Sequence, residues 1–184
     1  MDTDDKEKFR KNYIWFNQFF GDLRQLMTAI SKRLASEFGL AKSDKSWYYE
    51  KPDYQPRIPP YYLTALGGTA SVVQIFAVLD ETLLEEQRAF KHEPSLIVVK
   101  HSRTNRVLYS ADYGLRIIGN KGITQAQTNE KVIAGDFRAG DGKGAKYFAF
   151  QATLDHFAAG NDIDAAIRTE IIDVLRDLPD WEVN

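Results

Sequence analysis

The chain has 184 residues, of which 43% are hydrophobic and 12% aromatic, and its formal net charge is −2. This length and composition allow one domain with a substantial core, and the near balance of charge excludes a global attraction to nucleic acid or to an anionic membrane. The absence of cysteine excludes disulfide bonds, thiolate nucleophiles and thiolate metal sites.

Hydropathy predicts a soluble, cytoplasmic protein with no membrane partner. The sequence opens with acidic residues and lacks a basic segment followed by an apolar run, which a secretory signal would need. It also lacks any stretch of about 18 apolar residues, the length that crosses a bilayer as a helix.

The first forty residues carry an apolar stripe with helical spacing. Its members follow one another at intervals of 4, 3, 4, 3, 4, 3 and 4 residues: Phe9, Tyr13, Phe16, Phe20, Leu23, Met27, Ile30 and Leu34. This period predicts a long amphipathic helix over residues 5–38, with Asp4 and Glu7 at its start and Gly39 after its end. Burying these eight side chains would contribute on the order of 10 to 20 kcal/mol. Ordering more than thirty residues costs about 1 to 2 kcal/mol for each, so the helix is not stable on its own. It must therefore pack on its own domain or on a partner chain.

Residues 40–60 form an aromatic and proline-rich connection in which helix is not expected. The rings there either cover one edge of the core or form a contact surface for another protein. A proline-rigidified aromatic surface loses little entropy on binding, which favours a protein interface as its functional interpretation. With aromatic neighbours from the first helix and the following strand, the candidate interface residues are Trp15, Phe19, Trp47, Tyr48, Tyr49, Tyr54, Tyr61 and Tyr62.

Residues 61–119 predict an antiparallel sheet region. Gly67 and Gly68 suggest a tight hairpin turn, because glycine accepts positive φ at both central positions. A second hairpin is expected through Thr104 and Asn105, and residues 80–91 favour a short helix, with a charged edge strand as the alternative. The expected strands are residues 61–66, 71–79, 95–99, 106–109 and 115–118.

The last third of the chain predicts a glycine-rich region over 120–144, with a short strand at 131–134, and a helical pair over 145–178. The first helix of the pair depends on apolar residues spaced 3, 4 and 3 apart from Tyr147 to Phe157, although strand alternation also fits. The second helix begins after Asp162 and ends at Pro179. The predicted fold is therefore a single α+β domain over 1–184, with a long N-terminal helix packed on a mainly antiparallel sheet and a C-terminal helical pair.

The glycine-rich loop is the best candidate for chemistry. A strand, a glycine loop and a helix N-terminus together present backbone N–H groups to a phosphate. The loop lacks the Ser or Thr that a phosphate-binding loop places after its lysine, so the favoured prediction is a surface loop that binds no ligand. The candidate anion-binding residues are Arg138, Gly140, Gly142, Lys143, Gly144 and Lys146.

Acidic residues near this loop suggest a second form of the same hypothesis. Asp141 and Lys143 form a D-x-K triplet, and Asp112 and Asp136 supply further acids, as in metal-dependent phosphodiester cleavage. The triplet is short and lies among glycines, where a rigid metal site is not expected.

Basic and histidine side chains give weaker signals. Lys100, Arg103 and Arg106 suggest a basic hairpin tip that would contact nucleic acid, although solvated tips are usually charged in any case. The three histidines, His92, His101 and His156, have no metal-binding spacing, and each is expected to be exposed or locally bonded.

The function predicted from these residues is a non-catalytic binding or regulatory module that acts through protein contact and self-associates. The alternative is an enzyme or nucleotide-binding protein that acts on a phosphate-containing ligand at residues 135–146, with Mg²⁺-dependent phosphodiester chemistry as one form. No cofactor is predicted.

Overall fold

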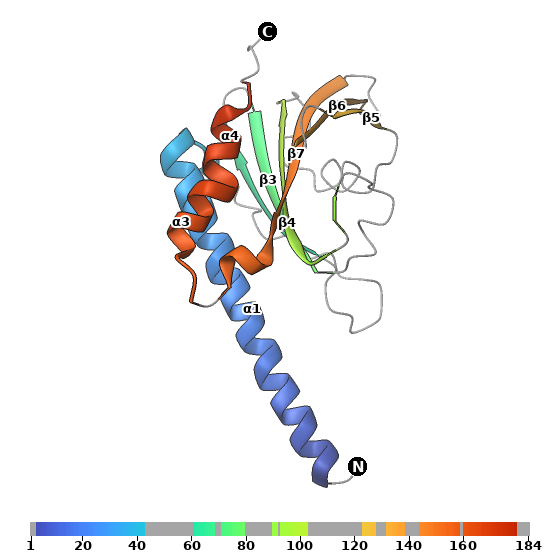
Figure 1. Cartoon of the computed structure of the whole chain (residues 1–184), viewed down its shortest axis with the longest axis vertical. Coiled ribbons are helices and arrows are strands. Elements are labelled where there is room, and N and C mark those ends of the chain that lie inside the picture. The colour runs from blue at the N-terminus through green and yellow to red at the C-terminus, as the bar shows by residue number, and fades with distance from the viewer. Residues whose placement is uncertain are drawn as a thin grey trace.

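The computed structural model describes residues 3–42, 61–68, 71–79, 90–91, 93–102, 123–127, 132–138, 144–158 and 160–179. These residues form a long N-terminal helix, an antiparallel sheet, and a C-terminal helix that lies beside the first one (Figure 1). The predicted α+β class is confirmed.

Helix α1 (Thr3–Phe38) confirms the predicted N-terminal helix. Gly39 follows it with a φ of 62°, a left-handed conformation that glycine adopts without steric cost. Only the C-terminal part of its apolar stripe is fully buried, with at most 5% of each side chain exposed: Leu23, Met27, Ile30 and Leu34. These residues join the hydrophobic core that covers one face of the sheet.

The sheet has the strand order β1-β2-β3-β4-β7-β6-β5, and every neighbouring pair is antiparallel. Two runs of sequential neighbours, β1 to β4 and β5 to β7, meet where β4 pairs with β7. The strands are β1 (Ala41–Lys42), β2 (Tyr61–Gly67), β3 (Ser71–Val78), β4 (Ser95–Ser102), β5 (Ile123–Gln127), β6 (Val132–Arg138) and β7 (Gly144–Thr153).

The hairpin between β2 and β3 is present, but its turn differs from the predicted one. Gly67 belongs to β2 and pairs with Val72, and the Gly68 N–H donates to the Ser71 carbonyl at 2.8 Å. Neither glycine has a positive φ, so the predicted reason for them is wrong. At Gly68 a Cβ atom would lie 2.9 Å from Cδ2 of Leu40, so glycine permits a close approach here.

Strand β4 confirms the strand predicted at 95–99 and extends it to Ser102. Its two neighbours are β3 and β7, so the predicted pairing of residues 95–99 with 106–109 is wrong. The other features predicted between β1 and β5 lie outside the described residues: the remainder of the 43–60 connection, residues 80–89, the turn at Thr104 and the strand at 115–118.

Residues 145–153 are strand, so the predicted helix from Tyr147 to Phe157 is wrong. Strand β7 continues to Thr153 and is followed by a single 3-10 turn, η2 (Leu154–Phe157). Both faces of β7 are buried, with Phe148 at 8%, Ala149 at 0% and Phe150 at 2% exposure. Consecutive apolar residues in such a strand satisfy helical spacing and strand alternation together, and the helical match was coincidental.

One C-terminal helix replaces the predicted pair. It comprises α3 (Ile163–Ile167), a π-helical turn, η3 (Arg168–Ile172), and α4 (Asp173–Asp177). Asp162 caps it as predicted, accepting a hydrogen bond from the Ala165 N–H at 3.0 Å. The π-turn adds a residue to one turn, so the buried face includes Ile172 and Leu175 besides Ile167 and Ile171.

Alternate residues of the central strands face two separate buried layers. On the helix-covered face, Val73, Ile75, Val98 and Phe150 contact the core that contains α1 and the C-terminal helix. The opposite face is also buried, and it carries Val72, Gln74, Phe76, Ile97, Val99, His101, Tyr147 and Ala149.

Candidate protein-binding surface

The N-terminal half of α1 carries large apolar side chains that the fold leaves in solvent. Figure 1 shows this half extending beyond the sheet and the C-terminal helix. Exposure is 65% for Phe9, 60% for Tyr13, 46% for Ile14 and 63% for Trp15, whereas Met27 of the same helix is fully buried. The helix thus has a docked half and an apolar exposed half.

Aromatic rings connect the two halves of α1. Trp15 stacks on Phe19 with 5.6 Å between ring centroids, and Phe19 contacts the edge of Phe20 at 5.2 Å. Both phenylalanines are partly buried against the core. Because one end of this ring cluster is anchored, Trp15 presents its surface with little conformational freedom to lose on binding.

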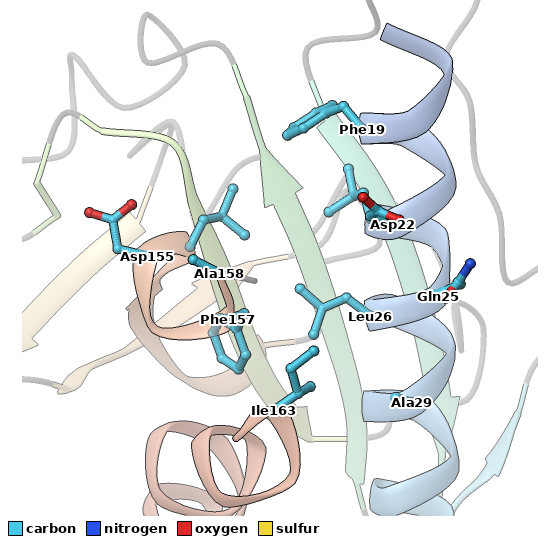
Figure 2. Close-up of a pocket in the computed structure, with 11 residues that line it drawn as sticks. Phe19, Asp22, Gln25, Leu26, Ala29, Asp155, Phe157, Ala158 and Ile163 are labelled. Atoms are coloured by element: carbon cyan, nitrogen blue, oxygen red, sulfur yellow. The ribbon is translucent and has the colours of Figure 1, made fainter. Parts of the chain in front are cut away.

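A half-open groove of about 690 Å³ begins at Phe19, between α1 and the segment that joins β7 to the C-terminal helix. Figure 2 shows Phe19 and Leu26 on α1 facing Phe157 and Ile163 across it. Two carboxylates, Asp22 and Asp155, are exposed at its sides. Its lining residues are Phe19, Asp22, Leu23, Gln25, Leu26, Ala29, Leu154, Asp155, Phe157, Ala158 and Ile163.

The second wall of the groove depends on the end of β7. Turn η2 follows Thr153 directly, and the Asn161 side-chain amide donates to the carbonyls of Asp155 at 3.0 Å and His156 at 3.3 Å. Nδ1 of His156 lies 3.1 Å from a carboxylate oxygen of Glu170. These contacts hold η2 against the C-terminal helix and so position Phe157 in the groove.

The groove was not predicted from the sequence, although one of its residues was. Phe19 was a predicted interface residue and lines the groove, and the predicted Trp15 is exposed beside it. Tyr61 and Tyr62 begin β2, opposite Val78 and Ala77 in the pairing with β3. The remaining predicted interface residues lie outside the described part of the chain: Trp47, Tyr48, Tyr49 and Tyr54.

The glycine-rich loop joins β6 to β7, which pair as antiparallel strands. Arg138 ends β6 and Gly144 begins β7, so the element after the loop is a strand. Residues 144–153 are strand and so supply no helix N-terminus, and no helix dipole, directly after the loop. Gly140, Gly142 and Lys143 lie outside the described residues.

The acidic candidates around the loop are placed only in part. Asp136 is exposed on β6, directly across from Lys146 on β7. Asp112 and Asp141 lie outside the described residues. Within the described part of the chain, no group of three or more His, Asp or Glu side chains is placed to hold a metal ion. Phosphate or metal binding at this loop stays a prediction.

The predicted basic hairpin tip is wrong at Lys100, which is buried at 6% exposure in the middle of the sheet. Its Nζ donates to the carbonyl of Pro179 at 3.2 Å and so ties β4 to the end of the C-terminal helix. Arg103 and Arg106 lie outside the described residues.

A buried polar pair on the opposite face of the sheet was also not predicted. His101 and Tyr147 are direct cross-strand partners, 2% and 1% exposed, where His101 was expected to be exposed or locally bonded. Burial lowers the pKa of His101 to about 4, an effect partly offset by the nearby Ser102 carbonyl, 3.1 Å from Nδ1. Burial, with a smaller contribution from Asp136, raises the pKa of Tyr147 to about 12. Both side chains are therefore uncharged near neutral pH.

No described helix is long and apolar enough to span a membrane. Comparison of the whole chain with protein-family models, with curated proteins and with solved structures finds no match.

Proposed function

We propose that this chain is a protein-binding module that self-associates through the N-terminal half of α1. The observation that carries the proposal is the cluster of Phe9, Tyr13, Ile14 and Trp15, each between 46% and 65% exposed within two helical turns. Single exposed apolar residues are ordinary on protein surfaces, whereas contiguous large ones mark interaction sites. Aromatic side chains are also enriched at the centres of protein interfaces.

The apolar stripe gives a second argument. Its spacing of 3 and 4 residues continues from the buried Leu23 into the exposed half without a break. A solvated helix extension needs no apolar stripe, because charged side chains at these positions would support the helix equally well. The exposed stripe therefore fits a helix that is covered in an assembly.

The test is the mass of the full chain in solution, measured by sedimentation equilibrium over a wide concentration range. The wild type should form a reversible dimer, and Phe9→Ser, Tyr13→Ser and Trp15→Ser in combination should give a monomer. The control carries Asn17→Ser and Gln18→Ser, which place serine at two exposed polar positions of the same helix segment. The control should remain a dimer. A wild type that stays monomeric at every concentration overturns the proposal.

A further inference from the structure

The side chains that line the groove beside α1 indicate the chemistry of a partner that would bind there. Its walls are mainly apolar, and its only charged lining residues among those described are Asp22 and Asp155. Figure 2 shows Leu26 on one wall and Phe157 and Ile163 on the other, with Asp22 on α1 and Asp155 beyond them. A matching partner would present apolar side chains together with positive charge.

The exposed beginning of α1 has this composition. Residues 5–11 contain four cations and two acids around the exposed ring of Phe9, and with Asp4 of the first turn the net charge of residues 3–11 is +1. Glu7 is already paired with Lys11 at 3.1 Å within the helix. Lys8 and Arg10 are exposed. The basic, apolar end of one copy is thus complementary to the acidic, apolar groove of another.

One flank of α1 supports an antiparallel arrangement of two copies. Lys8, Asn12, Trp15, Phe19, Asp22 and Leu26 recur at intervals of 4, 3, 4, 3 and 4 residues, which places them along one side of the helix. In an antiparallel pair centred on position 17, Trp15 lies opposite Phe19 of the second copy, and Asn12 lies opposite Asp22. Lys8 then enters the groove beside Leu26, one helical turn from Asp22.

The position of the folded body disfavours the parallel alternative. The sheet and the C-terminal helix lie at the C-terminal half of α1 (Figure 1). Parallel helices would bring two such bodies to the same end, on the face where each already packs against its own α1. Antiparallel helices place the bodies at opposite ends, so each N-terminal half can lie on the other copy.

Trp15 is the exposed ring on this flank. It is 63% exposed, which leaves on the order of 100–150 Å² of its surface for the second copy. Phe9 and Tyr13 lie on the neighbouring apolar stripe, roughly 100° or more around the helix from the line through Lys8 and Leu26, so they do not add to the area of the groove contact.

We propose that the groove receives the basic N-terminal turns of α1 from a second copy of this chain, with the two α1 helices antiparallel and Trp15 against Phe19 of the other copy. The inference depends on the proposed self-association and specifies its geometry. It makes the contact two-fold symmetric, so each copy gives one helix end and receives one.

Charge exchange tests the pairing of groove and helix end in the full chain. Asp22→Lys alone, and Lys8→Glu with Lys11→Glu alone, each place like charges together in both contacts and should raise the dimer Kd at least about tenfold. An equimolar mixture of these two variants restores opposite charge in both contacts. The mixture should form mixed dimers with near wild-type Kd, and a mixture no tighter than its components overturns the inference.

Because the chain has no cysteine, disulfide trapping tests direction and register. Asn12→Cys mixed with Asp22→Cys should give a disulfide between unlike chains under mild oxidation. Either variant alone should not cross-link, because its cysteines would lie ten residues apart along the antiparallel pair, roughly 15 Å. Strong disulfides within each single variant would indicate parallel helices and overturn the groove contact while self-association stands. A wild type that is monomeric overturns both proposals.

Discussion

Acid should destabilise this protein through one buried histidine. His101 is 2% exposed and its pKa is lowered from 6.5 to about 4 by burial. Above pH 6.5 the imidazole is neutral in both the folded and the unfolded state, so stability does not depend on its proton. Between pH 6.5 and 4 the unfolded state binds a proton that the folded state does not, and the free energy of unfolding falls as the pH falls.

The loss in the free energy of unfolding follows from the difference between the folded and unfolded pKa values of His101. One pKa unit corresponds to about 1.36 kcal/mol, so His101 should remove about 2 kcal/mol between pH 7 and pH 5 and about 3 kcal/mol once the pH is below 4. The window above pH 5 is the cleaner one, because most carboxylates stay ionised there. Tyr147 opposite His101 remains neutral throughout, since its pKa is raised to about 12.

Urea unfolding followed by far-ultraviolet circular dichroism at pH 7, 6 and 5 measures this effect. His101→Gln keeps a polar amide at the position but does not titrate, so its unfolding free energy should be nearly constant over this range, whatever its value at pH 7. An unchanged wild-type stability at pH 5, or a full pH dependence in His101→Gln, would refute the reasoning.

Two further predictions concern the helices. Ile30→Ala empties a fully buried position of α1 and should lower the free energy of unfolding by about 3 kcal/mol, which lowers the Tm by roughly 6–12 °C. Tyr13→Ala in the exposed half should change monomer stability by less than about 0.5 kcal/mol. Equal losses for the two variants in thermal melts at low concentration would contradict the division of α1 into two halves. Asp162→Ala removes the side chain that caps the Ala165 N–H and should lower the free energy of unfolding by about 1 kcal/mol, with faster hydrogen exchange at that amide. Asp164→Ala in the same first turn is the control and should leave the Ala165 amide protected.

The sequence predicted those elements whose signal is local. Helix α1 was predicted over 5–38 and spans Thr3–Phe38, because its stripe is uninterrupted and Gly39 ends it. The same stripe could not show which half is buried. Phe9 and Ile30 have equivalent positions in the repeat, yet they are 65% and 0% exposed, because exposure depends on where the sheet ends.

The errors occurred where a local pattern has two solutions. Strand β7 is buried on both faces, so its apolar residues fit a helix as well as a strand, and pairing with β4 and β6 decides between them. Because residues 147–157 were expected to form a helix, the groove could not be predicted: Phe157 lines it because β7 ends in the turn η2. The sequence predicts a solvated Lys100 because lysine is usually exposed, whereas the structure buries it with its Nζ bonded to the carbonyl of Pro179, 79 residues away along the chain.

The docked and exposed halves of α1 together explain why its stripe extends beyond the fold. Four side chains, Leu23, Met27, Ile30 and Leu34, hold the helix on the sheet, and Phe9, Tyr13 and Trp15 add nothing to that contact because more than half of each lies in solvent. Exposed rings of this kind favour aggregation unless another surface covers them. Trp15 is also held by stacking on Phe19, at the entrance of a groove with two carboxylates, while residues 3–11 of the same helix carry a net charge of +1. One copy cannot place the beginning of its own α1 in its own groove, because one wall of the groove is a later part of the same continuous helix. The α1 of a second copy, running in the opposite direction, can reach it.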